Sequence, residues 1–140
     1  LAAAEEPVKA AGAKRAVRLK DPGAFHSPIM RYAYGGFREL LTDVQLKDPA
    51  IAFYSNVTGG RVSSGAELKK LAAEQIISPV RWIDEEKSII ADGYGRVVEA
   101  GPGTVLAGLW KSAESDIVVA PAGTVPQIQA VAGTVPRSES

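Results

Sequence analysis

Helix-forming and strand-forming segments alternate along this 140-residue chain, and no other feature restricts its fold as strongly. Short apolar runs bounded by turn residues predict strands at residues 16–19, 51–55 and 96–99. Helices are expected at residues 1–11, after residue 28 as far as residue 41, and at residues 65–77, 79–93 and 104–110. Because such alternation is typical of strand–helix–strand units, we predict an α/β fold with a parallel sheet.

Local signals within these segments indicate where helices begin, weaken and bury side chains. Ser64 and Glu67 have the spacing of a capping box at a helix N-terminus. Gly35 and Gly36 each weaken their helix by roughly 1 kcal/mol relative to alanine. Pro7 is expected to kink or shorten the first helix. Four apolar residues of one helix are candidates for the core: Met30, Phe37, Leu40 and Leu41.

The composition excludes several classes of protein. Lys+Arg and Asp+Glu both number 16, so the formal net charge is +0, whereas a general nucleic-acid or membrane-surface binder has an excess of basic residues. With no cysteine, the chain cannot form a disulfide framework, a zinc–thiolate site or a cysteine nucleophile. No apolar run approaches the roughly 20 residues of a membrane span. We therefore expect neither nucleic acid nor membrane as a partner.

The chain has one histidine, His26, in a short loop between a turn at residues 21–23 and Pro28. A lone histidine is more often structural or exposed than catalytic. Its place between a predicted strand and a predicted helix favours a catalytic role, because α/β folds carry reactive groups on loops at strand ends. We expect this loop at the C-terminal edge of the sheet.

Five segments resemble one enzyme family, in the order and spacing of that family. They are AGAKRAVRL (residues 11–19), GAFHSPIM (23–30), DPAIAFYSNVTG (48–59), QIISPVRW (75–82) and VVEAGPGTVLAGLWK (97–111). The second closely resembles the GAFHSPLM signature of the malonyl-CoA:acyl carrier protein transacylases. The similarity covers residues 8–111.

The resemblance implies a two-step acyl transfer without metal or other cofactor. In the family, a serine of a GHSLG segment attacks malonyl-CoA, a histidine takes the serine proton, and the malonyl group then passes to the acyl carrier protein thiol. His26 matches that histidine, and an imidazole with a pKa near ~6.5 suits the role. Gln75 matches the glutamine whose main-chain carbonyl orients the histidine; without the resemblance it is an ordinary helix-end residue. The family implies fatty acid biosynthesis in the cytoplasm.

Two further features have a possible functional reading and a structural one. In the functional interpretation, the Phe25 ring excludes the extra methyl of a methylmalonyl group beside the histidine of the family. In the structural interpretation, Phe25 only packs the loop. The basic residues could steer an acidic carrier protein, although such clusters are usually solvated faces; they are Lys9, Lys14, Arg15, Arg18 and Lys20. The Gly101-Pro102-Gly103 segment lacks the spacing of a nucleotide-binding loop and is expected to be a tight strand-to-helix turn.

The resemblance also implies the organisation of the chain. We expect the end of a ferredoxin-like small subdomain at residues 1–20, a C-terminal segment of an α/β-hydrolase-like acyltransferase core at 21–112, and a C-terminal extension at 113–140. The pentapeptide AGTVP occurs twice in that extension. No Gly-X-Ser-X-Gly segment is present, so we expect a fragment that is inactive alone. Two alternatives are an acyltransferase-domain fragment of a polyketide or fatty-acid synthase, and a non-catalytic remnant.

Overall fold

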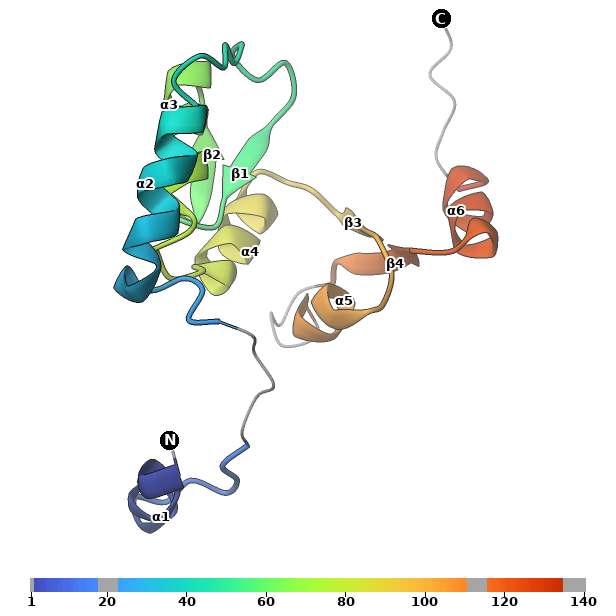
Figure 1. The fold of residues 1–140 in the computed structure, drawn as a ribbon. Helices are drawn as coiled ribbons and strands as arrows, with labels where there is room; N and C mark the ends of the chain where they lie inside the picture. The colour runs from blue at the N-terminus through green and yellow to red at the C-terminus, as the bar shows by residue number, and fades with distance from the viewer. Residues whose placement is uncertain (1, 18–22, 111–115, 135–140) are drawn as a thin grey trace, which may run out of the picture.

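The structure of this chain, a computed structural model, describes residues 2–17, 23–110 and 116–134. Its elements are helices and short strands, which alternate singly only from α4 onward (Figure 1). In chain order they are α1 (Ala2–Ala10), the 3₁₀ helix η1 (Pro28–Met30), α2 (Arg31–Leu40), β1 (Phe53–Ser55), β2 (Gly60–Val62), α3 (Gly65–Glu74), α4 (Trp82–Ala91), β3 (Arg96–Ala100), α5 (Val105–Trp110), β4 (Val118–Ala122) and α6 (Val125–Ala132). Helix α1 lies apart from the other elements, and α2, α3, α4 and the first two strands form one group.

The strands form two separate pairs within the described ranges. Strands β3 and β4 are parallel, with Arg96 opposite Val118 and Ala100 opposite Ala122. Strands β1 and β2 are antiparallel, with Phe53 opposite Val62. The expected parallel sheet is therefore present for β3 and β4 and wrong for β1. The reason is local: a turn that ends at Gly59, whose φ of 70° suits glycine, folds β2 back onto β1.

Helices α3 and α4 each differ from the sequence prediction at one boundary. Helix α3 ends at Glu74, and residues 75–77 form turns. Helix α4 begins at Trp82, not at residue 79. Before it, the main-chain N–H of Arg81 donates to the carbonyl of Asn56 at 2.8 Å, and this bond ties the entry of α4 to the end of β1. Pro7 lies inside α1 without ending it.

The predicted strand at 16–19 is the one strand without support in the described residues. Residues 16 and 17 have no strand conformation, and residues 18 and 19 lie outside the described ranges, as do Arg18 and Lys20 of the basic cluster and the turn residues Asp21 and Pro22. The proposed boundaries at residues 20 and 112 stay predictions. A strand at 118–122 was not predicted from the sequence, although β4 pairs with β3 along its whole length.

Helix α2 buries little of its predicted core face. Met30 and Leu41 are partly buried, whereas the exposed fractions of Phe37 and Leu40 are 38% and 75%. The core prediction is wrong for these two side chains because α2 packs against α3 on one side only. Among the described residues, the buried apolar side chains are Val62, Leu71, Ala73 and Trp110.

The β3–α5 connection is the tight turn that its glycines predict. Gly101 and Gly103 have φ values of 124° and 100°, which side-chain-bearing residues rarely adopt. The buried carboxylate of Glu99 then accepts the main-chain N–H groups of Leu106 at 3.0 Å and Ala107 at 2.9 Å. These two bonds cap the first turn of α5 and fix it against the end of β3. Nowhere in residues 2–17, 23–110 and 116–134 is a helix long and apolar enough to cross a bilayer.

Candidate functional site

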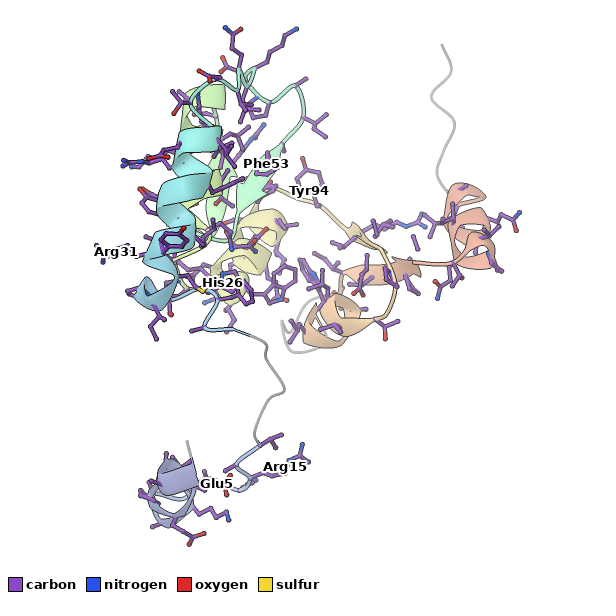
Figure 2. All side chains as sticks on the ribbon, in the orientation of Figure 1. Glu5, Arg15, His26, Arg31, Phe53 and Tyr94 are labelled. Atoms are coloured by element: carbon purple, nitrogen blue, oxygen red, sulfur yellow. The ribbon has the colours of Figure 1, made fainter. Side chains whose placement is uncertain are left out.

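His26 lies in the turn that precedes η1, and its backbone is held in an uncommon conformation. Its φ of 59° is the only positive value of a non-glycine residue in the described part of the chain. Such a conformation costs on the order of 1–3 kcal/mol, so it persists only where neighbouring contacts hold it. One of these contacts is the main-chain N–H of His26, which donates to the carbonyl of Ile76 at 3.1 Å. Figure 2 shows His26 at the end of the helical group where the chain enters α2.

The imidazole of His26 contacts the main chain of Gln75, as predicted. Its Nδ1 lies 3.0 Å from the Gln75 main-chain oxygen, and the side-chain Nε2 of Gln75 lies farther away at 3.5 Å. A carbonyl oxygen can only accept, so Nδ1 carries the proton in this contact. The neutral ring then keeps its lone pair on Nε2. An imidazole in this tautomer can accept a proton at Nε2 without losing its anchor.

The oxygen that holds the ring belongs to the C-terminal end of α3. Gln75 is the C-cap of this helix, and carbonyls at a helix end have no partner within the helix. His26 bonds this carbonyl through its ring, and it bonds the carbonyl of the next residue, Ile76, through its main-chain N–H. The helix C-terminus carries partial negative charge, which favours a cation placed there. The loop is therefore docked on the end of a helix, and its expected location at the C-terminal edge of the sheet stays a prediction.

Ser27 also holds this loop, a role that was not predicted from the sequence. It is the N-cap of η1, and its Oγ accepts the N–H of Ile29 at 3.4 Å. The same hydroxyl donates to the carbonyl of Ala24 at 2.7 Å. The signal that could have found it is a serine directly before Pro28, the usual order of an N-cap and the first helical residue.

Phe25 packs against its own loop. A Cβ atom built on Gly23 would lie 3.1 Å from Cε2 of the Phe25 ring. Phe25 is nonetheless 52% exposed, so a large part of its surface faces outward beside His26. Both predicted roles of Phe25, loop packing and substrate discrimination, are compatible with this placement, and the second stays a prediction.

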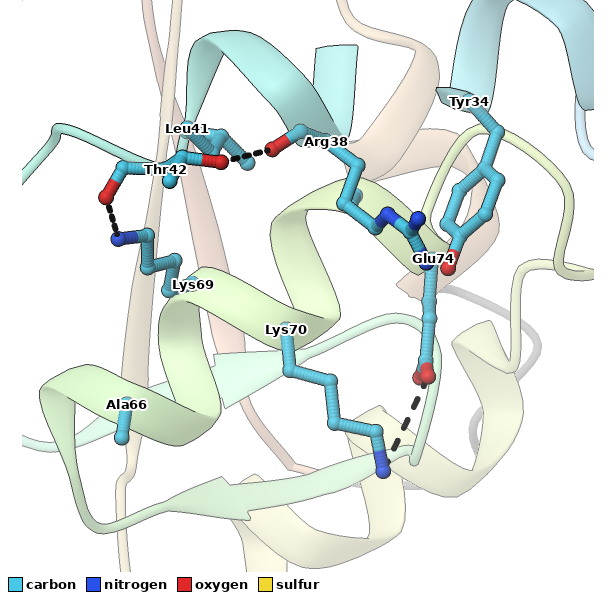
Figure 3. Close-up of a pocket in the computed structure, with 9 residues that line it drawn as sticks. Tyr34, Arg38, Leu41, Thr42, Ala66, Lys69, Lys70 and Glu74 are labelled. Atoms are coloured by element: carbon cyan, nitrogen blue, oxygen red, sulfur yellow. Dashed lines mark hydrogen bonds and ion pairs between the residues drawn. The ribbon is translucent and has the colours of Figure 1, made fainter. Parts of the chain in front are cut away.

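A cavity of about 530 Å³ lies between α2 and α3 (Figure 3). Its cations have partners within the chain. Lys69 donates to the main-chain oxygen of Thr42 at 2.6 Å, and the guanidinium of Arg38 lies 5.7 Å from the centre of the Tyr34 ring. The Lys69 bond joins α3 to the end of α2, whereas the Arg38 contact lies within α2. His26 does not line the cavity. Within the described ranges, no group of three His, Cys, Asp or Glu side chains could hold a metal ion.

Comparisons with known proteins relate most of the chain to acyl-transferring enzymes. The malonyl CoA-acyl carrier protein transacylase of Bacillus subtilis is 39% identical over 108 residues, which are 77% of this chain and 34% of that protein. A polyketide biosynthesis protein of Burkholderia thailandensis is 41% identical over 93 residues, which are 66% of this chain and 8% of that protein. No protein-family model matches.

The fold is similar to solved structures of the same enzymes. A type II polyketide-synthase acyl carrier protein in complex with its malonyl transacylase matches with a TM-score of 0.83 and 30% identity, over 94% of this chain and 43% of the solved one. The chain therefore spans between a third and a half of the length of these transacylases.

Proposed function

Since this chain belongs to the malonyl-CoA:acyl carrier protein transacylase family, we propose that it supplies the general base for transfer of malonyl from malonyl-CoA to acyl carrier protein. His26 is that base. The observation that carries the proposal is the 3.0 Å contact of His26 Nδ1 with the Gln75 carbonyl, because it leaves Nε2 free to accept a proton. Gln75 acts only through its main-chain oxygen, by holding the ring.

In the first half-reaction, a serine hydroxyl attacks the thioester carbonyl of malonyl-CoA while Nε2 of His26 takes the hydroxyl proton. The carbon–sulfur bond breaks, a malonyl-serine ester forms, and the imidazolium returns its proton to the coenzyme A thiolate. In the second half-reaction His26 takes the proton of the carrier-protein thiol, which attacks the ester, and then protonates the serine oxygen. The nucleophilic serine comes from a Gly-His-Ser-X-Gly segment that these 140 residues do not contain.

The finer assignments form part of the same proposal. Residues 21–112 are a C-terminal segment of an α/β-hydrolase-like core, residues 1–20 are the end of a ferredoxin-like subdomain, and residues 113–140 follow as an extension. The substrate is malonyl-CoA, the partner is acyl carrier protein, and no cofactor or metal takes part. The pathway is fatty acid biosynthesis in the cytoplasm, with Phe25 favouring malonyl over methylmalonyl. The identity to a large polyketide biosynthesis protein supports one alternative, an acyltransferase domain of a synthase.

A chimera tests the proposal. This chain replaces the homologous segment of the Bacillus subtilis relative, which then supplies the serine. We expect transfer of labelled malonyl to acyl carrier protein by the chimera and none by the 140-residue chain alone. His26→Ala in the chimera should lower the rate by at least ~10².

Three other outcomes are informative. An unchanged rate for His26→Ala, or transfer by the chain alone, would overturn the assignment of the base. An inactive chimera beside an active Bacillus enzyme would favour the non-catalytic remnant. Faster transfer to a polyketide-synthase carrier protein than to a fatty-acid one would favour the synthase alternative.

A further inference from the structure

The hydroxyl of Ser27 bridges the two sides of His26. On one side it donates to the main-chain oxygen of Ala24, two residues before the histidine, at 2.7 Å. On the other it accepts the N–H of Ile29, at the start of η1, at 3.4 Å. His26 is the third residue of the turn Ala24–Ser27 and has the left-handed conformation that usually requires glycine at such a position. The hydroxyl therefore closes the turn that contains the strained residue.

Further contacts of the same segment hold the loop from the η1 side. Pro28 has no N–H, so the N–H of Ile29 is the first donor that can bond the cap. The N–H of Met30 bonds the main-chain oxygen of Ser27 at 3.1 Å. Ser27 itself is extended, with φ of −140° and ψ of 159°. The hydroxyl thus connects the turn to η1, while the end of α3 holds His26 from the opposite direction.

From this geometry we propose that Ser27 is a positioning residue, which rests on the proposed function of His26 as the base. Its hydroxyl keeps the turn closed, and the closed turn keeps the His26 ring on the Gln75 carbonyl with Nε2 directed outward for proton transfer. Without the hydroxyl, His26 relaxes toward ordinary negative φ values, and the ring leaves the end of α3. Ser27 touches neither substrate nor the transferred proton.

The first test measures the tautomer of the His26 imidazole directly by NMR. His26 is the only histidine of the chain, so ¹⁵N-histidine labelling of the 140-residue chain gives one imidazole whose two nitrogen shifts report the tautomer. We expect the Nδ1-protonated form in the wild type and in Ser27→Thr, since threonine keeps the hydroxyl and tolerates an extended backbone. Ser27→Ala should shift the population toward the Nε2-protonated form. A wild-type chain without the Nδ1-protonated form, or a Ser27→Ala spectrum identical to it, overturns the proposal.

The second test uses the chimera described above. Displacing a catalytic group by about 1 Å can cost up to ~10² in rate, so we expect Ser27→Ala to lower kcat by about tenfold or more. The KM for malonyl-CoA should change by no more than about twofold, because Ser27 does not bind substrate, and Ser27→Thr should restore kcat to within about twofold. An unchanged kcat overturns the proposal, and so does a Ser27→Ala chain that far-ultraviolet circular dichroism shows to be unfolded.

The two tests separate this inference from the proposed function. If the wild-type chimera transfers no malonyl, the proposed function fails, and the tautomer of His26 still decides whether Ser27 positions the ring. If the chimera is active and Ser27→Ala changes neither tautomer nor kcat, the proposed function stands and the positioning role is wrong.

Discussion

The main-chain oxygen of Gln75 lies 3.0 Å from Nδ1 of His26, across 49 residues of sequence. The contact joins a strained loop to the C-terminal end of helix α3. Because the acceptor is a main-chain carbonyl, the contact with His26 requires that α3 end at residue 75, but it requires no particular side chain there. This distinction makes the two residues respond differently to mutation.

We expect Gln75→Ala to retain most of the malonyl transfer of the chimera, within about threefold, because the variant keeps its main-chain carbonyl. His26→Ala removes the proposed base and serves as the comparison, with an expected loss of at least ~10². Steady-state kinetics of both variants decide the matter. A loss in Gln75→Ala as large as in His26→Ala would show that the side-chain amide, 3.5 Å from Nδ1, holds the ring.

Two glycines at helices should respond oppositely to alanine. A Cβ at Gly65 would lie 2.0 Å from the main-chain oxygen of Leu46, so Gly65→Ala should destabilise the fold by about 1–3 kcal/mol or more. At Gly36, inside α2, the added Cβ meets no atom within 4 Å beyond its chain neighbours and its own helix backbone, and Gly36→Ala should stabilise by about 0.5–1 kcal/mol. Urea unfolding followed by tryptophan fluorescence measures both. Equal shifts of the midpoint in the same direction would contradict the packing of Gly65 against Leu46.

Sequence reasoning succeeded where structure depends on local chemistry. The Ser64 cap and the Gly101–Gly103 turn are each determined by residues within a few positions, and both are present. It failed where residues distant in sequence determine the structure, as for the exposure of Leu40 and the pairing of β4 with β3. The contact of His26 with Gln75 was predicted only because the family resemblance supplied a pairing that no local pattern contains.

The repeated pentapeptide AGTVP illustrates why a short local sequence is insufficient. Thr124 of the first copy is the N-cap of α6, in a capping box with Gln127. In the second copy, Gly133 is the C-cap of the same helix, and the hydroxyl of Thr134 donates to the carbonyl of Val131 at 2.7 Å. Identical residues thus begin a helix at one place and end it at another. The flanking residues make the difference, because Gln127 stands directly after the first copy and completes its capping box.

Glu85 should make the stability of the fold depend on pH. Burial raises the pKa of its carboxyl above 4.5, and the hydrogen bond from Asn56, 2.5 Å from Oε2, opposes this only in part. A raised pKa means that the folded state binds the proton more tightly. Its contribution to stability is therefore complete below the unfolded value and is lost as pH rises through the folded value.

Glu85→Gln isolates this effect, because glutamine stays neutral and keeps an oxygen for Asn56. The free energy of unfolding of the variant should rise relative to wild type as pH increases from below about 4.5 to neutrality. Urea unfolding across this range measures the difference. A difference that is constant with pH would show that Glu85 is not shifted in the folded state.

Tyr54 should ionise only at strongly alkaline pH. Burial, followed by the hydrogen bond to Asp92 and the negative charge of that residue, raises its pKa from 10.0 to about 12. The folded state holds this proton more tightly, so the stabilisation is complete below pH 10 and is lost as pH rises through about 12. Asp92→Asn should lower the pKa of Tyr54 only part of the way to 10, since burial is the largest cause.

Ultraviolet titration of phenolate follows the four tyrosines, and Tyr54→Phe identifies the step that belongs to Tyr54. If that step lies at an ordinary tyrosine pKa, or if Asp92→Asn leaves it in place, the contact between Tyr54 and Asp92 does not persist in solution.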